Sequence, residues 1–89
     1  MGQNTYDVST TAVRVAEANT KRQSLWIANS GSSTIWLGPD NTVTPSTGNP
    51  LYGETHLLES KEAGNIYAGD YYAITSTGTS KVIVWEREK

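Results

Sequence analysis

The sequence predicts an all-β fold, a small antiparallel β-sandwich or barrel of about seven to eight short strands. The composition supports this, because Thr, Ser, Trp and Tyr are frequent, Phe is absent, and eight Gly and three Pro supply turns. Short apolar runs recur about every 8–12 residues between polar segments, which is typical of strands. No segment shows the apolar period of about 3.6 residues that an amphipathic helix requires.

The 89-residue chain is predicted to form one β-domain, in which residues 1–9 are an extended N-terminal arm and residues 10–86 are the sandwich or barrel. A domain of this size is usually stabilised by disulfides, metals or partner subunits. The chain has no Cys and a single His, His56, which excludes disulfides and thiolate or multi-histidine metal sites within one chain. We therefore expect a homo-oligomer.

The expected strands follow from alternation and from the positions of proline. Val13 and Val15 share one face of residues 11–16, which is the pattern of a half-buried strand. Pro45 and Pro50 keep their segment out of the centre of a sheet, because proline cannot donate a ladder hydrogen bond. The other strands are expected at residues 24–29, 34–38, around 55–58, 71–76 and 80–86, with a short edge strand at 42–44.

Residues 24–38 read SLWIANSGSSTIWLG and are predicted to form a hairpin with one tryptophan on each strand. Its core face consists of Leu25, Ile27, Ile35 and Leu37. Two loops preserve this face, a three-residue loop at 29–31 or a loop centred on Gly31 that pairs Trp26 directly with Trp36. With either loop the two indoles are opposite or diagonal neighbours on the outer face.

The closing strand repeats this arrangement, with Val82 and Val84 on the core face and Ile83 and Trp85 on the outer face. The residues expected to contact a partner or another subunit are Trp26, Trp36, Ile83, Trp85 and Tyr6 of the arm. Tryptophan is enriched at interface hot spots, and a contiguous apolar patch is unusual on a monomer. The alternative is that the tryptophans cover the open edges of a thin sandwich.

Charge and hydropathy argue against two classes of partner. The net charge of −2 lacks the basic excess of a nucleic-acid-binding protein, and the adjacent Lys21 and Arg22 are expected in a solvated turn. No stretch approaches the roughly 20 apolar residues of a membrane span, and no signal peptide is recognised after MGQNTYD. We expect no nucleic-acid partner, no membrane partner, and synthesis in a cytoplasm.

No catalytic, cofactor-binding or metal site is predicted. The sequence lacks a P-loop, a dinucleotide-binding G-x-G-x-x-G and a G-x-S-x-G elbow. Asp40 and Asn41 lack the spacing of a calcium loop and are expected to form a turn. His56 is expected to be a structural or surface residue, although a small hydrolase would need it beside a serine or carboxylate. We therefore expect a binding protein and not an enzyme.

Four segments of the chain read R-x-SL-x-IAN-x-G-x₃-I-x-LG, PDNTVT, NPLYGE and GDYYAITSTGTSKVIVWE. Their pattern resembles that of small virion structural proteins of tailed bacteriophages, and the resemblance covers about residues 11–86. The chain departs from the family pattern at Trp36, where Tyr is usual, and at 51–54, which lacks the Pro before Gly.

The family it resembles most is that of the head decoration, or cement, proteins. The resemblance implies a homo-oligomer, a trimer or a dimer, that binds the major capsid protein on the virion exterior and stabilises the shell. The alternative is a phage tail- or fibre-associated module, or a glycan-binding β-module whose exposed aromatic rings stack on sugars.

Overall fold

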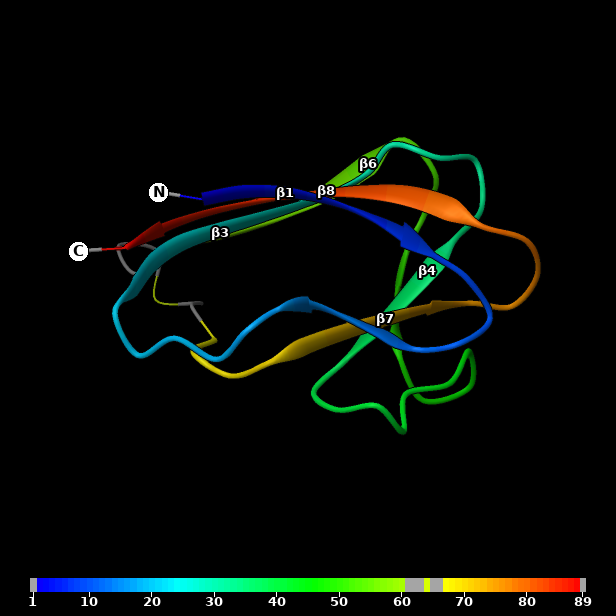
Figure 1. Ribbon diagram of the computed structural model, residues 1–89, viewed down its shortest axis with the longest axis horizontal. Coiled ribbons are helices and arrows are strands. Elements are labelled where there is room, and N and C mark those ends of the chain that lie inside the picture. The colour runs from blue at the N-terminus through cyan, green and yellow to red at the C-terminus, as the bar shows by residue number, and fades with distance from the viewer. Residues whose placement is uncertain (1, 61–63, 65–66, 89) are drawn as a thin grey trace.

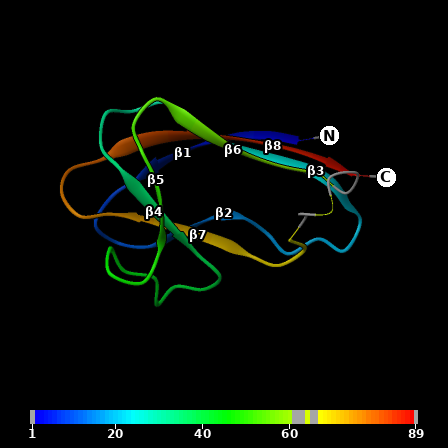
Figure 2. The same cartoon turned by 180° about the vertical axis from the view of Figure 1, so that it is seen from behind.

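The computed structural model describes residues 2–60, 64 and 67–88, and eight strands form its regular structure (Figure 1). They are β1 (Gly2–Val8), β2 (Val13–Ala16), β3 (Arg22–Asn29), β4 (Ile35–Gly38), β5 (Asn49–Leu51), β6 (Thr55–Ser60), β7 (Tyr71–Thr75) and β8 (Ser80–Glu88). Two four-stranded antiparallel sheets pack face to face, sheet A with the order β1-β8-β3-β6 and sheet B with the order β2-β7-β4-β5 (Figures 1 and 2). The predicted all-β sandwich is confirmed.

The strand order is that of a jelly roll, a double-sheet fold of eight strands and two Greek keys. Every connection passes from one sheet to the other except the one between β4 and β5. The β1–β2 and β7–β8 loops lie at one end of the sandwich, and both chain ends lie at the other (Figure 1). Sequence neighbours are therefore mostly partners across the core and not within a sheet.

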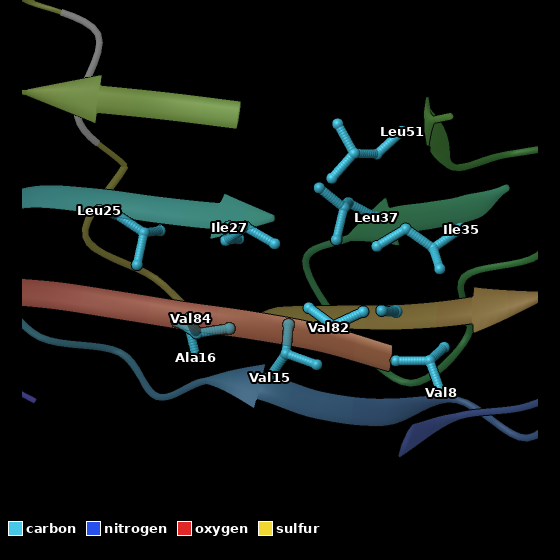
Figure 3. Close-up of a cluster of buried hydrophobic side chains, with 11 residues drawn as sticks. Val8, Val15, Ala16, Leu25, Ile27, Ile35, Leu37, Leu51, Val82 and Val84 are labelled. Carbon is cyan, nitrogen blue, oxygen red and sulfur yellow. The ribbon is translucent and has the colours of Figure 1, made fainter. Parts of the chain in front are cut away.

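The core between the sheets is built from small and branched aliphatic side chains (Figure 3). Its members are Val8, Val15, Ala16, Leu25, Ile27, Ile35, Leu37, Leu51, Ala73, Val82 and Val84. None of the three tryptophans belongs to this cluster. The indole rings are thus left to the outside of the sandwich.

The polar N-terminal segment expected as an arm is extended and forms β1, an edge strand of sheet A. It pairs antiparallel with β8 in continuous register from Gly2↔Glu86 to Val8↔Ser80. Val8 is fully buried. The sandwich therefore extends over this segment, beyond the boundary expected at residue 10.

The hairpin predicted at residues 24–38 is wrong in both registers. β3 pairs with β6 and β8 in sheet A, whereas β4 pairs with β5 and β7 in sheet B. Leu25 and Ile27 do meet Ile35 and Leu37 in the core, but from opposite sheets (Figure 3). Apolar alternation shows which side of a strand faces the core and does not identify the neighbouring strand.

The edge strand predicted at 42–44 is also wrong, because these residues belong to no strand and the strand of this segment is β5. Asp40 stabilises the turn by accepting a hydrogen bond from the Thr42 backbone N–H at 3.0 Å, as expected for a turn former. Bonds from the hydroxyl and backbone of Thr42 hold the pKa of Asp40 below its usual range. Pro50 lies in β5 at the edge of sheet B, which agrees with its expected exclusion from a central strand.

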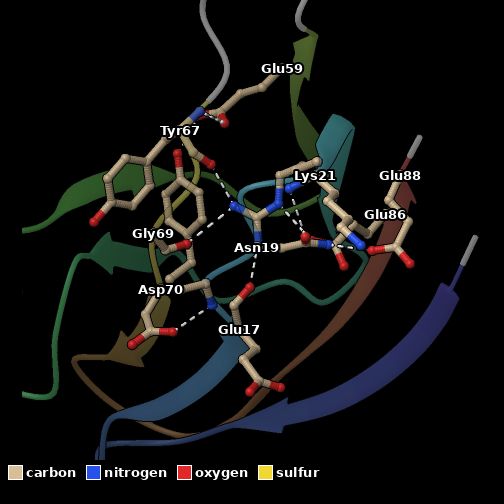
Figure 4. Close-up of polar contacts among 12 residues, drawn as sticks. Glu17, Asn19, Lys21, Glu59, Tyr67, Gly69, Asp70, Glu86 and Glu88 are labelled. Atoms are coloured by element: carbon tan, nitrogen blue, oxygen red, sulfur yellow. Dashed lines mark hydrogen bonds and ion pairs between the residues drawn. The ribbon is translucent and has the colours of Figure 1, made fainter.

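Arg22 was predicted in a solvated turn, and this is wrong, since it is 2% exposed. Its Nε donates to Glu86 Oε2 at 2.5 Å, and its Nη2 donates to the Glu17 carbonyl at 2.6 Å. Its Nη1 donates to the carbonyls of Tyr67 and Gly69 at 2.5 and 3.1 Å. Figure 4 shows the surrounding residues. The guanidinium ties the β2–β3 loop, the segment before β7 and the end of β8 together.

Glu59 lies in the same region and is 7% exposed. Its carboxylate accepts a hydrogen bond from the Tyr67 backbone N–H at 3.1 Å (Figure 4). It also accepts one from the Tyr71 hydroxyl. Burial, together with the Glu59 carboxylate, raises the pKa of Tyr71 well above its usual value. The neutral hydroxyl is therefore part of the folded structure.

Asn29 fixes the opposite end of the sandwich and is 1% exposed. Its Nδ2 donates to the carbonyls of Ser33 and Leu51 at 2.7 and 2.9 Å. Its Oδ1 accepts from Ser80 Oγ at 2.5 Å and from the Gly31 N–H at 3.2 Å. A Cβ at Gly31 would lie 2.1 Å from Ser80 Oγ, so a side chain does not fit there. The Asn-x-Gly of the motif is thus a framework element.

Candidate binding face on sheet A

A row of apolar side chains crosses the outer face of sheet A. Trp26 on β3 pairs with Leu58 on β6 and with Trp85 on β8, and directly paired residues share a face of the sheet. Leu58 is 58% exposed and Trp85 is 47% exposed. The ring centroids of Trp26 and Trp85 are 5.1 Å apart with an interplanar angle of 53°. The two indoles therefore support each other while part of their surface remains accessible.

A second row lies next to the first. Ala28 pairs with His56 on one side and with Ile83 on the other. The His56 ring lies 5.8 Å from that of Trp26 at an angle of 45°, and His56 is exposed, as predicted for a surface residue. We call the two rows together the aromatic face, which comprises Trp26, Ala28, His56, Leu58, Ile83 and Trp85.

Two shallow depressions adjoin Trp26, which lines both. The first, of about 300 Å³, is lined by Ser24, Trp26, Leu58, Trp85, Glu86 and Arg87. The second, of about 350 Å³, is lined by Trp26, Ala28, Asn29, Ser30, Glu54, Thr55, His56 and Ile83. Trp26 is thus the centre of the face, with a depression on either side.

Charged residues border the aromatic face at both ends of the strands. Arg87 pairs with Ser24 at one end, and Lys81 pairs with Asp7 at the other. Glu54, in the turn before β6, is the charged residue that lines the second depression. Its φ is 62°, a left-handed conformation that is unfavourable for a residue with a side chain. An apolar centre with a polar rim is the usual composition of a protein–protein interface.

The structure brings together three of the five predicted contact residues, Trp26, Ile83 and Trp85. Trp36 does not join them, because it lies on the outer face of sheet B between Pro50 and Ile74. The predicted pairing of Trp36 with Trp26 fails for the same reason as the hairpin, since their strands belong to different sheets.

Tyr6 lies on the other side of sheet A. It pairs with Val82, which is fully buried, and it packs against the core. The aromatic face and the Tyr6 side chain are therefore separated by the thickness of the sheet, and Tyr6 does not contribute to the same surface.

Leu58 and His56 belong to the aromatic face, but sequence reasoning did not select them. The pairing of β6 with β3 brings them there. The signal was present in THLLES, where His56 and Leu58 alternate with the partly buried Leu57 and the buried Glu59. Assigning the exposed half of this alternation to a face with Trp26 requires knowledge of the strand order.

The part of the chain that the structure describes contains no group of three or more His, Cys, Asp or Glu residues placed to hold a metal ion. Among the same residues, none forms a helix of the length and hydropathy needed to cross a membrane. Comparison of the chain with protein-family models, curated proteins and solved structures finds no match. The geometry of the aromatic face is the structural observation from which a function can be proposed.

Proposed function

We propose that this chain is a decoration protein of a tailed bacteriophage, and that it binds the major capsid protein on the outside of the head through the aromatic face. The observation that carries the proposal is the apolar row of Leu58, Trp26 and Trp85 across three strands, in which Leu58 and Trp85 are exposed and Trp26 is half-buried. Contiguous apolar surface of this kind, rimmed by charged residues, marks an interaction site. The resemblance to small virion proteins supplies the identity of the partner.

In this proposal the chain acts by binding and stabilises the shell mechanically. Full burial of a large apolar side chain contributes about 1.5–3 kcal/mol, and Leu58 and Trp85 each have about half of their surface still to bury. A single contact of this size gives modest affinity. Copies placed over the junctions between capsomers would act together, because each capsomer is then held by several contacts at once.

A glycan-binding module, associated with a tail or fibre, is the alternative use of the same residues. The depression beside Trp26 contains Glu54 and His56, which could bind sugar hydroxyls. The rings of Trp26 and Trp85, however, are inclined by 53° and pack against each other, so they do not offer one common plane for stacking on a saccharide chain. This inclination favours a protein partner with side chains that fit on either side of Trp26.

Co-sedimentation with phage heads tests the proposal. The purified protein is mixed at increasing concentration with heads of the phage that encodes it, assembled without it, and the bound protein is measured in the pellet. We expect saturable binding with a fixed number of copies per head. Retention on host polysaccharide, with none in the head pellet, would overturn the proposal in favour of the glycan-binding module.

A further inference from the structure

The edge strand β1 differs from the edges of sheet B. β2 has four residues and a register shift between Arg14 and Ala16, and β5 has three residues and contains Pro50. Short length, irregular register and proline are features that prevent an edge from pairing with another chain. β1 has none of them, since it is seven residues long, lacks proline and keeps one register from end to end. At the other edge of sheet A, Leu58 and Ser60 of β6 take part in further contacts.

The strand β1 is also held firmly in an extended conformation. Its inward-facing Tyr6 and Val8 pack in or against the core, and β8 pairs with it along one side. Asn4, Thr5 and Asp7 are exposed. Along its other side, the described part of the chain places no strand beside it. A pre-ordered edge of this kind can bind an added strand through main-chain hydrogen bonds at little cost in conformational entropy.

We propose that β1 pairs antiparallel with β1 of a second copy about a two-fold axis at Thr5, so that the two A sheets become one eight-stranded sheet. The sequence of β1 is self-complementary in this register. Thr5 lies opposite Thr5 of the second copy, and Thr–Thr pairs are favourable across strands. Asp7, the only charged residue of β1, lies opposite position 3 and not opposite itself. The interface is isologous, as in most dimers.

The dimer orients the two aromatic faces in a way that suits binding to the head. This part of the inference rests on the proposed function. A two-fold axis perpendicular to the joined sheet leaves both outer faces on the same side. The two aromatic faces therefore point toward one surface, and the dimer binds it at two places. Bivalent binding of this kind raises the apparent affinity by about 10²–10⁴-fold when both sites can be engaged together.

Disulfide trapping tests the pairing and its register. The chain has no Cys, so Thr5→Cys introduces a single thiol. Directly opposed residues have Cβ atoms about 4.5–5.5 Å apart, close to the distance that a disulfide requires. We expect Thr5→Cys to give a covalent dimer of twice 9.7 kDa under mild oxidation. The control is Asp7→Cys, whose two copies would be displaced by four residues, about 14 Å, and should not cross-link.

A charge-pair experiment provides an independent measurement on the free protein. By light scattering, the unmodified protein should have twice the monomer mass of 9.7 kDa. Thr5→Lys and Thr5→Glu should each be monomeric, because like charges meet at the axis, and their equimolar mixture should recover the dimer. The same change at the exposed turn residue Thr77, Thr77→Lys, should leave the dimer unchanged.

The inference is overturned if the unmodified protein is monomeric, if Asp7→Cys cross-links as readily as Thr5→Cys, or if Thr5→Lys remains dimeric. Neither experiment uses phage heads. A failure here leaves the binding of the aromatic face to the head intact, whereas a failure of co-sedimentation would leave the β1 dimer standing without its proposed partner.

Discussion

Replacement of Arg22 by Ala should destabilise the fold severely, because the side chain is buried and makes four hydrogen bonds. Removal of one member of a buried ion pair costs about 3–5 kcal/mol. Here Glu86 keeps 28% of its side chain exposed, so water can solvate its carboxylate and the loss lies toward the lower end. Three backbone carbonyls also lose a donor, but they belong to the same buried network, so their cost is contained in this figure and is not added to it. We expect a total loss of about 3–4 kcal/mol in the free energy of unfolding.

This loss is large for a domain of this size, whose free energy of unfolding is expected at about 4–13 kcal/mol from the usual range per residue. Urea unfolding followed by circular dichroism measures it. With a slope of about 1–1.5 kcal/mol per molar urea, the midpoint should fall by about 2–4 M. Lys21→Ala is the matched control, because its side chain is exposed at the neighbouring position and should change the stability by less than about 0.5 kcal/mol.

Arg22→Lys separates charge from geometry. Lysine keeps the positive charge but lacks the planar fork that reaches Glu86 and the loop carbonyls simultaneously, so it should recover only part of the lost stability. If Arg22→Ala loses less than about 1 kcal/mol, the guanidinium does not hold the two loops to β8 and the reasoning fails.

Three further predictions concern residues that hold the fold together. Asn29→Ala should cost about 2–4 kcal/mol, measured by urea unfolding, because the carbonyls of Ser33 and Leu51 and the Ser80 hydroxyl lose their partner; a loss below about 1 kcal/mol contradicts this. Glu54→Gly should raise the stability by about 0.5–1 kcal/mol, since φ at this position is 62°, and an unchanged melting temperature would count against strain at this turn. The raised pKa of Tyr71 stabilises the folded state fully below pH about 10, and this contribution is lost as the pH rises further, because the unfolded chain ionises first. Unfolding of Tyr71→Phe between pH 9 and 11 should therefore depend less on pH than that of the unmodified protein, and equal slopes would refute the assignment.

The sequence alone was sufficient to assign the two faces of β3 from Leu25 to Ile27 and of β8 from Val82 to Trp85. The alternation around Trp26 and Trp85 correctly separated outer from core residues, because burial follows the period of a strand whatever its neighbour. The partner of each strand could not be predicted in the same way. In a jelly roll nearly every connection crosses the core, so the short loop after Asn29 leads to the opposite sheet and not to a hairpin.

The buried polar residues were missed for a different reason. Regular alternation from Trp26 back through Ser24 would place Arg22 on the outer face. A register irregularity between Arg22 and Ser24 instead turns the Arg22 side chain toward the interior. Such irregularities depend on contacts with distant segments, here the carbonyls of Tyr67 and Gly69, which no local pattern reveals. The segment R-x-SL-x-IAN begins at Arg22 and ends at Asn29, and both side chains are buried and hold the framework of the fold.

The role of the aromatic face is tested most directly by titrating phage heads with Trp85→Ala and Tyr52→Ala in parallel with the unmodified protein. Trp85 is 47% exposed and packs against Trp26 at the centre of the face, and Tyr52 is a similarly exposed aromatic residue, at 62%, outside it. We expect Trp85→Ala to fold normally by circular dichroism and to bind heads at least about tenfold more weakly, as at an interface hot spot, while Tyr52→Ala binds normally. Unchanged binding by a folded Trp85→Ala would contradict the proposal that the aromatic face binds the capsid.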